Sequence, residues 1–154
     1  ESNLLDGFAH FYDTYECKDN KFIAVGSIEP QFYSELLEKL EIDDKKFIDQ
    51  YNKELWPELK GLIALKIKSK TRYEWIEIFS ESDACVTPVL DMQEAQDHPH
   101  NVSRKAFINI DGFNQPNASP RYSKTKLEIK HNAKEVGVDL DDICNEFNIS
   151  KEAF

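Results

Sequence analysis

The residue whose position best suits chemistry is a single carboxylate, Glu29. It follows strand-type residues at 22–25 and stands directly before Pro30, which fits the first turn of a helix because that turn needs no backbone donor. Junctions between a strand and a helix commonly carry functional side chains. A carboxylate there can equally do no more than complement the positive end of the helix dipole, for about 0.3–1 kcal/mol. A role as a base requires a partner His, Lys or acid, because the surroundings set the strength of a base.

Other reactive side chains do not form a recognisable site. His98 and His100 are the closest pair of metal-type ligands, but a zinc site needs a third and a fourth ligand. The acids just upstream are explained more simply as caps and solvated positions of a short helix, so we expect no metal. The sequence also lacks a Gly-x-Ser-x-Gly elbow, a cysteine signature and a glycine-rich phosphate loop.

The chain is acidic, which limits its partners. Its 19 basic and 29 acidic side chains give a net charge of −10, so binding to nucleic acid or to an anionic membrane surface is disfavoured by repulsion. The basic run at 66–72 is typical of a solvated helix end rather than of a phosphate site. No stretch approaches the roughly 20 apolar residues of a membrane helix.

Cysteine usage and the first residue indicate the setting of the protein. Its three cysteines are far apart and odd in number, which predicts a reducing, intracellular environment rather than a disulfide framework. The sequence begins at Glu1 without an initiator Met, and we expect it to be a piece of a longer protein.

The elements that would position Glu29 can be predicted from periodicity and turn residues. Residues 11–25 favour a β-hairpin whose turn contains Asn20, and residues 30–40 favour a helix. A short helix is expected after Asp43 and another from about Pro57; their predicted inner faces are Phe47, Ile48 and Tyr51 for the first and Leu59, Leu62, Ile63 and Ile67 for the second. Thr71 and Glu74 have the spacing of a capping box that opens a helix.

The second half of the chain is less regular. Residues 85–90 predict an extended segment that Pro88 restricts to an edge or an end, a short helix follows Asp91, and 107–110 predicts a last strand. The stretch 111–134 has little periodicity. A helix at 140–147 is expected to present an apolar stripe that needs another surface to cover it, formed by Leu140, Ile143, Cys144 and Phe147.

These elements predict the α+β class: a small domain with a short antiparallel sheet and several helices. We assign residues 1–8 to an incoming linker, 9–110 to the small domain, 111–135 to an irregular linker and 136–154 to a terminal helix segment.

Several blocks resemble one family closely. The segments NLLDG at 3–7, FYDTYEC at 11–17 and AVGSIEPQFY at 24–33 are similar to one continuous stretch of the α-methylacyl-CoA racemases. The later segments TRYEW at 71–75, DACVTPVL at 83–90 and HPHN at 98–101 resemble the racemase small domain and its return segment. Residues 137–150 resemble the last helix of the family more loosely. The resemblance is to the racemase branch of the class III CoA-transferases.

The resemblance implies a particular site. A Rossmann-like large domain, absent from this chain, would carry the CoA site and receive the terminal helix, and two chains would interlock into a homodimer. The substrate would be a 2-methylacyl-CoA thioester, with no separate cofactor. Glu29 would be the catalytic carboxylate that orients a His of the large domain, and the acyl-thioester pocket would be lined by Leu5, Tyr12 and Ile28. The His and Asp that exchange the proton would lie outside this chain, which alone would be inactive.

Two alternatives accompany this interpretation. One is a CoA-transferase of the same family, although the glycine-rich loop that such enzymes often have near 26–30 is missing here. The other is a non-catalytic interaction domain that docks through the helix at 139–147. The resemblance also implies a peroxisomal or mitochondrial enzyme of branched-chain fatty-acid metabolism. Residues 8–10, Phe-Ala-His, depart from the usual Gly-Ala-Pro of the racemases and are expected to alter bulk and rigidity beside the pocket.

Overall fold

The computed structural model describes residues 3–153 and divides the chain into two compact units, Glu1–Asp91 and Met92–Phe154. Each unit contains one small antiparallel sheet together with helices. The predicted α+β class is therefore confirmed. The division falls inside the range 9–110 that the sequence analysis assigns to a small domain, and the assignment of the flanking ranges to linkers and to a large domain stays a prediction.

The first unit is organised on a three-stranded sheet in the order β1-β2-β3, formed by Tyr12–Glu16, Phe22–Gly26 and Val86–Val89. The first two strands form the predicted hairpin, and Asn20 takes a positive φ of 59° in its turn, which Asn tolerates better than most residues do. Strand β3 pairs antiparallel to β2 and lies at the edge of the sheet, as Pro88 requires.

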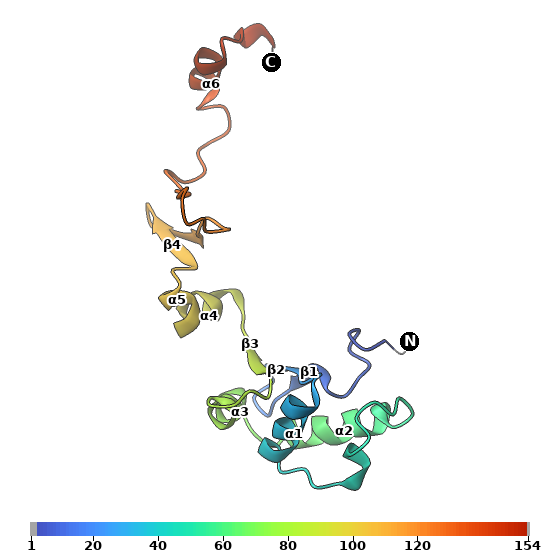
Figure 1. Ribbon diagram of the computed structural model, residues 1–154. Coiled ribbons are helices and arrows are strands. Elements are labelled where there is room, and N and C mark those ends of the chain that lie inside the picture. Colours follow the sequence, from blue (N-terminus) through green and yellow to red (C-terminus); the bar gives the residue numbers. More distant parts are fainter. Residues whose placement is uncertain (1–2, 154) are drawn as a thin grey trace. The chain divides into compact units, whose positions relative to one another are not determined.

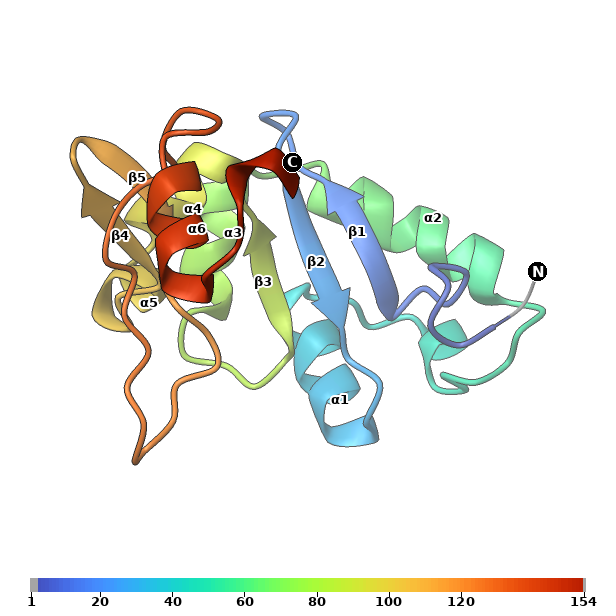
Figure 2. The same cartoon turned by 90° about the horizontal axis from the view of Figure 1, so that it is seen from above.

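Helices cover one face of this sheet. They are α1 (Pro30–Lys39), α2 (Trp56–Ile67) and α3 (Arg72–Phe79), with a 3₁₀ turn at Lys45–Phe47. Figure 1 shows the three helices on one side of the strands, and Figure 2 looks onto the other face of the sheet. Thr71 and Glu74 form the predicted capping box of α3, with the Thr71 N–H donating to Glu74 Oε2 at 2.8 Å.

The core between sheet and helices is aromatic and aliphatic, and its fully buried side chains include Phe11, Ile23, Leu36, Trp56, Leu59, Ile63 and Trp75. Three predicted core positions are wrong. Ile48 is 81% exposed, Tyr51 49% and Leu62 37%, because the segment after Asp43 makes only one 3₁₀ turn and α2 buries a narrower stripe than its composition suggests.

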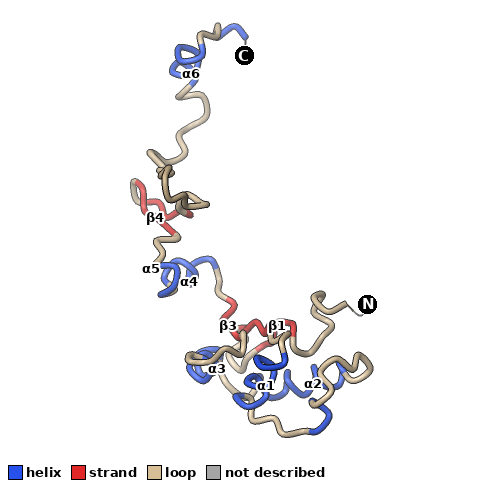
Figure 3. Tube along the Cα trace, viewed as in Figure 1, coloured by secondary structure: helices blue, strands red, loops and turns tan. Residues whose placement is uncertain are grey.

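The second unit begins with two short helices, α4 (Met92–Asp97) and α5 (Pro99–Ser103). A hairpin of β4 (Phe107–Ile110) and β5 (Phe113–Pro116) follows, so 107–110 is not the last strand and the predicted irregular stretch starts later than expected. A long loop, tan in Figure 3, leads to α6 (Leu140–Phe147) and a 3₁₀ turn at Lys151–Ala153. Every helix among residues 3–153 is too short or too polar to cross a membrane.

Only part of the apolar stripe on α6 is covered. Cys144 is buried, whereas Ile143 is 43% and Phe147 65% exposed. Asn148 ends the helix in the left-handed conformation, with φ 53° and ψ 47°. The helix predicted at 140–147 is confirmed. Within the described part of the chain, no side chains bury Ile143 and Phe147.

His10 is buried completely within the aromatic core of the first unit. Its Nε2 lies 2.7 Å from the Tyr33 hydroxyl, which in turn donates to the Phe47 carbonyl at 3.2 Å. The Tyr33 proton is thus engaged, so His10 Nε2 is the donor and Nδ1, which has no hydrogen-bond partner, carries no proton. Burial lowers the pKa of His10 from 6.5 to about 4.

This buried imidazole predicts acid sensitivity. Between pH 6.5 and about 4 the unfolded chain takes up a proton that the folded chain refuses, so stability falls as the pH falls through this window. We expect the first unit to lose about 2 kcal/mol between pH 7 and pH 5. Urea unfolding followed by tryptophan fluorescence measures this loss, because both tryptophans, Trp56 and Trp75, belong to that unit.

The variant His10→Gln supplies the control, because its amide can donate to Tyr33 but does not titrate. Its stability should change much less between the two pH values, whatever its absolute stability. The exposed His131→Gln should behave like the wild type. An equal loss in His10→Gln and in the wild type would show that His10 is not the titrating group.

Candidate functional site

The face of the first sheet that the helices leave uncovered contains a hollow of about 500 Å³. The strand register explains which side chains reach it. Tyr12 pairs with Gly26 and Thr14 with Ala24, so these four residues share one face, and Thr87 joins them opposite Ala24. We call this space the sheet hollow. Gly26 has no side chain to fill the hollow; a Cβ there would lie in van der Waals contact with the Tyr12 ring, 3.8 Å away.

The backbone that leaves the hollow towards α1 is held by hydrogen bonds at every residue. The Gly26 N–H donates to the Cys85 carbonyl and the Ser27 N–H to the Phe11 carbonyl, both at 3.0 Å. The Ser27 hydroxyl donates to the Ala84 carbonyl at 2.5 Å. These bonds join the end of β2 to two other segments of the unit, so the turn into the helix is fixed.

Two side chains from the loop before α2 complete this anchoring. The Gln50 amide, almost fully buried, donates to the carbonyls of Ser27 at 3.0 Å and Ile28 at 2.9 Å. The Tyr51 hydroxyl donates to the same Ile28 carbonyl at 2.7 Å. Three donors therefore satisfy the last two carbonyls before Glu29, and they set where its side chain starts.

Glu29 itself occupies the N-cap of α1 with extended backbone angles, φ −73° and ψ 142°. Its carboxylate does not cap the helix by a hydrogen bond, and it makes no hydrogen bond or ion pair with any of residues 3–153. The side chain is exposed. The structure therefore presents a carboxylate with unused acceptor capacity, beside the positive end of a helix dipole.

Cys85 links this carboxylate to the hollow. It lines the hollow, and partial burial followed by the charges of Glu29, Asp83 and Glu35 raises the pKa of its thiol. The thiol therefore stays protonated near neutral pH and is a poor nucleophile. Glu29 does not itself line the hollow, but its charge acts on this lining residue.

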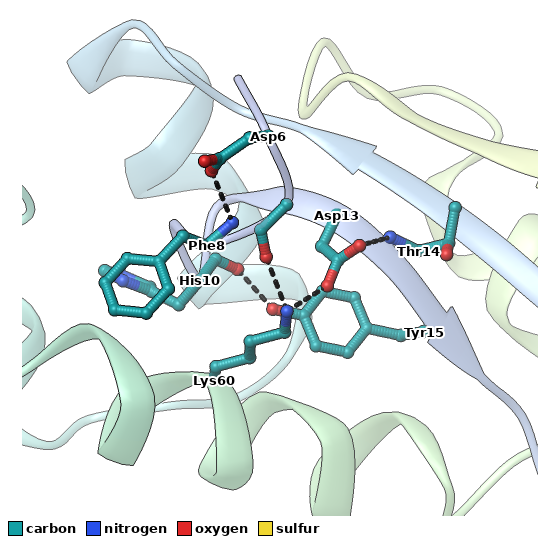
Figure 4. Close-up of polar contacts among 8 residues, drawn as sticks. Asp6, Phe8, His10, Asp13, Thr14, Tyr15 and Lys60 are labelled. Carbon is teal, nitrogen blue, oxygen red and sulfur yellow. Dashed lines mark hydrogen bonds and ion pairs between the residues drawn. The ribbon is translucent and has the colours of Figure 1, made fainter. Parts of the chain in front are cut away.

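The loop of residues 3–8, here the 3–8 loop, forms a wall of the hollow through Asp6 and Gly7. The Asp6 carboxylate accepts the N–H groups of Asn3 at 3.4 Å and Phe8 at 3.1 Å, which closes the loop on itself. Gly7 has a φ of +82°. Figure 4 shows Lys60 reaching from α2 towards Asp13 and the backbone of this loop.

Comparison with known proteins identifies the family. The family model described as CoA-transferase family III matches residues 2–139. The chain belongs to CoA-transferase family III. It is 40% identical over 153 residues to the α-methylacyl-CoA racemase of Mus musculus and 39% identical over 155 residues to that of Homo sapiens, each match covering 97% of this chain.

The chain spans 40% of the length of each of these family III racemases. Among solved structures, the orthorhombic crystal form of Rv3272 from Mycobacterium tuberculosis has a TM-score of 0.65 at 16% identity, over 78% of this chain and 34% of that one. This likeness concerns the fold, and it agrees with the α+β architecture described above.

The structure brings some of the predicted site residues together. Tyr12 lines the hollow, and the charge of Glu29 acts on Cys85, another lining residue. Leu5 is 59% exposed and does not line the hollow. The next two residues, Asp6 and Gly7, do. Ile28 packs partly against the core. The roles that the family resemblance implies for these residues stay predictions.

The unusual residues 8–10 of this family III chain belong to the core rather than to the hollow. Phe8 packs on Trp56 with ring centroids 5.9 Å apart, and Ala9 and His10 are fully buried. None of the three lines the hollow. They directly follow Gly7, which does line the hollow, and the expected change in bulk and rigidity beside the pocket stays a prediction.

Sequence reasoning missed the residues that hold the site in place. Gln50 lies in a loop, Tyr51 was expected on the inner face of a short helix rather than at a backbone carbonyl, and Lys60 is one of two lysines on α2. No local pattern distinguishes them, because each acts on a residue 22 to 53 positions away. Among residues 3–153 there is no group of three or more His, Cys, Asp or Glu residues able to hold a metal ion.

The positive φ of Gly7 predicts a cost for any side chain there. In Gly7→Ala the new Cβ would lie 3.2 Å from Asp13 Oδ1 and the backbone would be strained, so we expect a loss of about 1–2 kcal/mol. Gly61→Ala is the matched control, because that glycine lies inside α2 with open space around it; it should gain about 0.5–1 kcal/mol. Urea unfolding followed by tryptophan fluorescence measures the stability of both variants. Equal changes in Gly7→Ala and Gly61→Ala would show that the positive φ of Gly7 does not require glycine.

Proposed function

We propose that this chain is the carboxy-terminal portion of an isomerase that interconverts the R and S forms of 2-methylacyl-CoA thioesters. The observation that supports this most is the exposed Glu29 carboxylate, which follows a backbone fixed by hydrogen bonds to Ser27 and Ile28 and has no side-chain partner among residues 3–153. The similarity to two α-methylacyl-CoA racemases over 97% of the chain supports the same activity.

The reaction requires one base on each face of the α-carbon. One base removes the α-proton, the electron pair moves into the thioester carbonyl to form an enolate, and the acid on the opposite face returns a proton to the α-carbon. The proposal assigns these roles to a His and an Asp outside this chain. Glu29 would accept a hydrogen bond from the His ring, fix its tautomer and support its basicity, as carboxylates paired with histidines do.

The sheet hollow would hold the acyl end of the substrate. Its lining combines the Tyr12 ring and Ala24 with the hydroxyl of Thr87, which suits a branched acyl chain next to a thioester. The CoA phosphates would bind to another domain, because a chain of net charge −10 repels a polyanionic head group. The thioester carries its own CoA, so the proposal includes no separate cofactor.

We also propose how the full-length protein assembles and where it acts. The exposed positions Ile143 and Phe147 on α6 are available to pack on a large domain, and the full-length enzyme would be a homodimer in which such a domain completes the hollow. The chain alone would be inactive because it lacks the bases. A peroxisomal or mitochondrial location follows by similarity to the racemases.

A CoA-transferase is the second candidate, because the family model carries that description. Such an enzyme would move CoA from an acyl-CoA to a free carboxylic acid. The junction at 26–30 contains one glycine, Gly26, where the expectation for a transferase is a glycine-rich loop, and this favours the isomerase. Formation of a new thioester from a free acid and an acyl-CoA donor would reverse the order of the two candidates.

The test is exchange of the α-proton of a 2-methylacyl-CoA in deuterated water, catalysed by the full-length protein. Glu29→Gln keeps the size of the side chain but removes its charge, so the partner His would lose its support and exchange should fall roughly 100-fold. Mass spectrometry of the recovered thioester measures the deuterium taken up.

Glu38→Gln is the matched control, since it removes one exposed carboxylate from the same helix α1 and should leave exchange unchanged. Exchange that is undiminished in Glu29→Gln would remove Glu29 from the mechanism. No exchange by the wild-type protein would refute the isomerase itself.

A further inference from the structure

The wall of the sheet hollow is a loop that needs support from below. Residues 3–7 contain no helix or strand. Leu4 and Phe8 pack against the core on either side of the loop's middle, whereas Leu5 is 59% exposed, so Asp6 and Gly7 have no buried apolar side chain of their own to fix them. The Asx-type bonds of Asp6 shape the loop internally but do not tie it to the sheet. Phe8 packs on Trp56 at the exit of the loop. What holds the middle of the wall must come from another element.

Lys60 provides that tie. It lies on α2 beside the buried Leu59, and its ammonium group contacts two acceptors at once. It forms an ion pair with the Asp13 carboxylate on β1, and it donates to the Gly7 carbonyl at 2.5 Å. The side chains of Lys60 and Asp13 are only 35% and 23% exposed, which distinguishes this pair from the more exposed pairs of Lys46, Lys68 and Lys151.

The bridge also relieves a repulsion. Gly7 approaches Asp13 so closely that a Cβ on Gly7 would lie 3.2 Å from Asp13 Oδ1. The Thr14 N–H also donates a hydrogen bond to Asp13 Oδ1, at 2.8 Å. Without the Lys60 cation, the Asp13 carboxylate would face the oxygen of the Gly7 carbonyl with no charge between them, so the loop would move away from β1. Figure 4 shows the ammonium group of Lys60 between these acceptors.

We propose that Lys60 is a positioning residue for the sheet hollow: by bridging Asp13 and the Gly7 carbonyl, it holds the 3–8 loop as a preformed wall for the acyl group. As a role in substrate binding, this inference rests on the proposed function. Because the wall is ordered before the substrate arrives, substrate binding does not lose the conformational entropy of ordering the loop. Loss of the bridge should therefore weaken binding of the acyl-CoA and leave the chemical step largely intact.

The kinetic test compares three variants of the full-length protein. Lys60→Met keeps the length of the side chain but removes the charge, and KM for a 2-methylacyl-CoA should rise about ten-fold with kcat within about two-fold. Lys60→Arg keeps the cation and should recover most of the loss. Lys66→Met is the matched control, because it removes another ion pair, to Glu41, from the same helix and should change neither constant.

Amide hydrogen exchange of the same proteins tests the bridge independently of activity. Exchange in the peptide covering 3–11, which includes the Phe8 N–H bound to Asp6, should be about ten-fold faster in Lys60→Met and unchanged in Lys66→Met. A fall in kcat without a change in KM, or unchanged exchange in Lys60→Met, would overturn the inference. If the wild-type protein proves inactive, the proposed function fails, and the exchange measurement alone decides whether Lys60 holds the wall.

Discussion

The site depends on the fixing of two backbone carbonyls, those of Ser27 and Ile28. A strand that ends and turns at once into a helix leaves polar backbone groups without sheet or helix partners, and buried groups of this kind are costly when unsatisfied. Here Gln50 and Tyr51 supply the donors. The same bonds determine the direction in which the chain enters α1, so the position of Glu29 follows from the hydrogen bonds of its neighbours and of its own backbone, not from a contact of its side chain.

That arrangement explains why the carboxylate of Glu29 remains available. A carboxylate at an N-cap usually accepts a backbone N–H of the first turn, and this would use up its acceptor capacity. At Pro30 the ring removes one donor, and no side-chain cap forms at Glu29. A carboxylate at this position also lies at the positive end of the helix dipole. An exposed carboxylate without a hydrogen bond, on a backbone fixed by its neighbours, keeps its acceptor capacity for a group that the described residues do not supply, as the proposed function requires.

The sequence predicts those parts of the fold that local chemistry determines. The hairpin around Asn20, the helix after Pro30, the capping box at Thr71 and the edge strand with Pro88 each depend on residues a few positions apart, and all four were confirmed. The missed features depend on distant partners. Tyr51 was predicted on the inner face of a short helix after Asp43, whereas its hydroxyl donates to the Ile28 carbonyl and its side chain is 49% exposed. Strand β5 is an exception, because its turn is local: Asp111 and Gly112 join it to β4 and both have a positive φ. It was missed because its residues, Phe-Asn-Gln-Pro, show little hydrophobic alternation.

The strand β1 joins the candidate site to the core of the unit. Successive residues of a strand point to opposite faces, so Tyr12 turns towards the hollow while its neighbour Asp13 reaches Lys60 on α2. Below them, Tyr15 donates its hydroxyl to the His10 carbonyl at 2.6 Å, and His10 anchors the segment that follows the 3–8 loop. A shift of α2 relative to the sheet would therefore move Lys60, the loop and one wall of the hollow together. The residues that shape this hollow extend well beyond those that line it, which is why its geometry cannot be inferred from the motif around Glu29 alone.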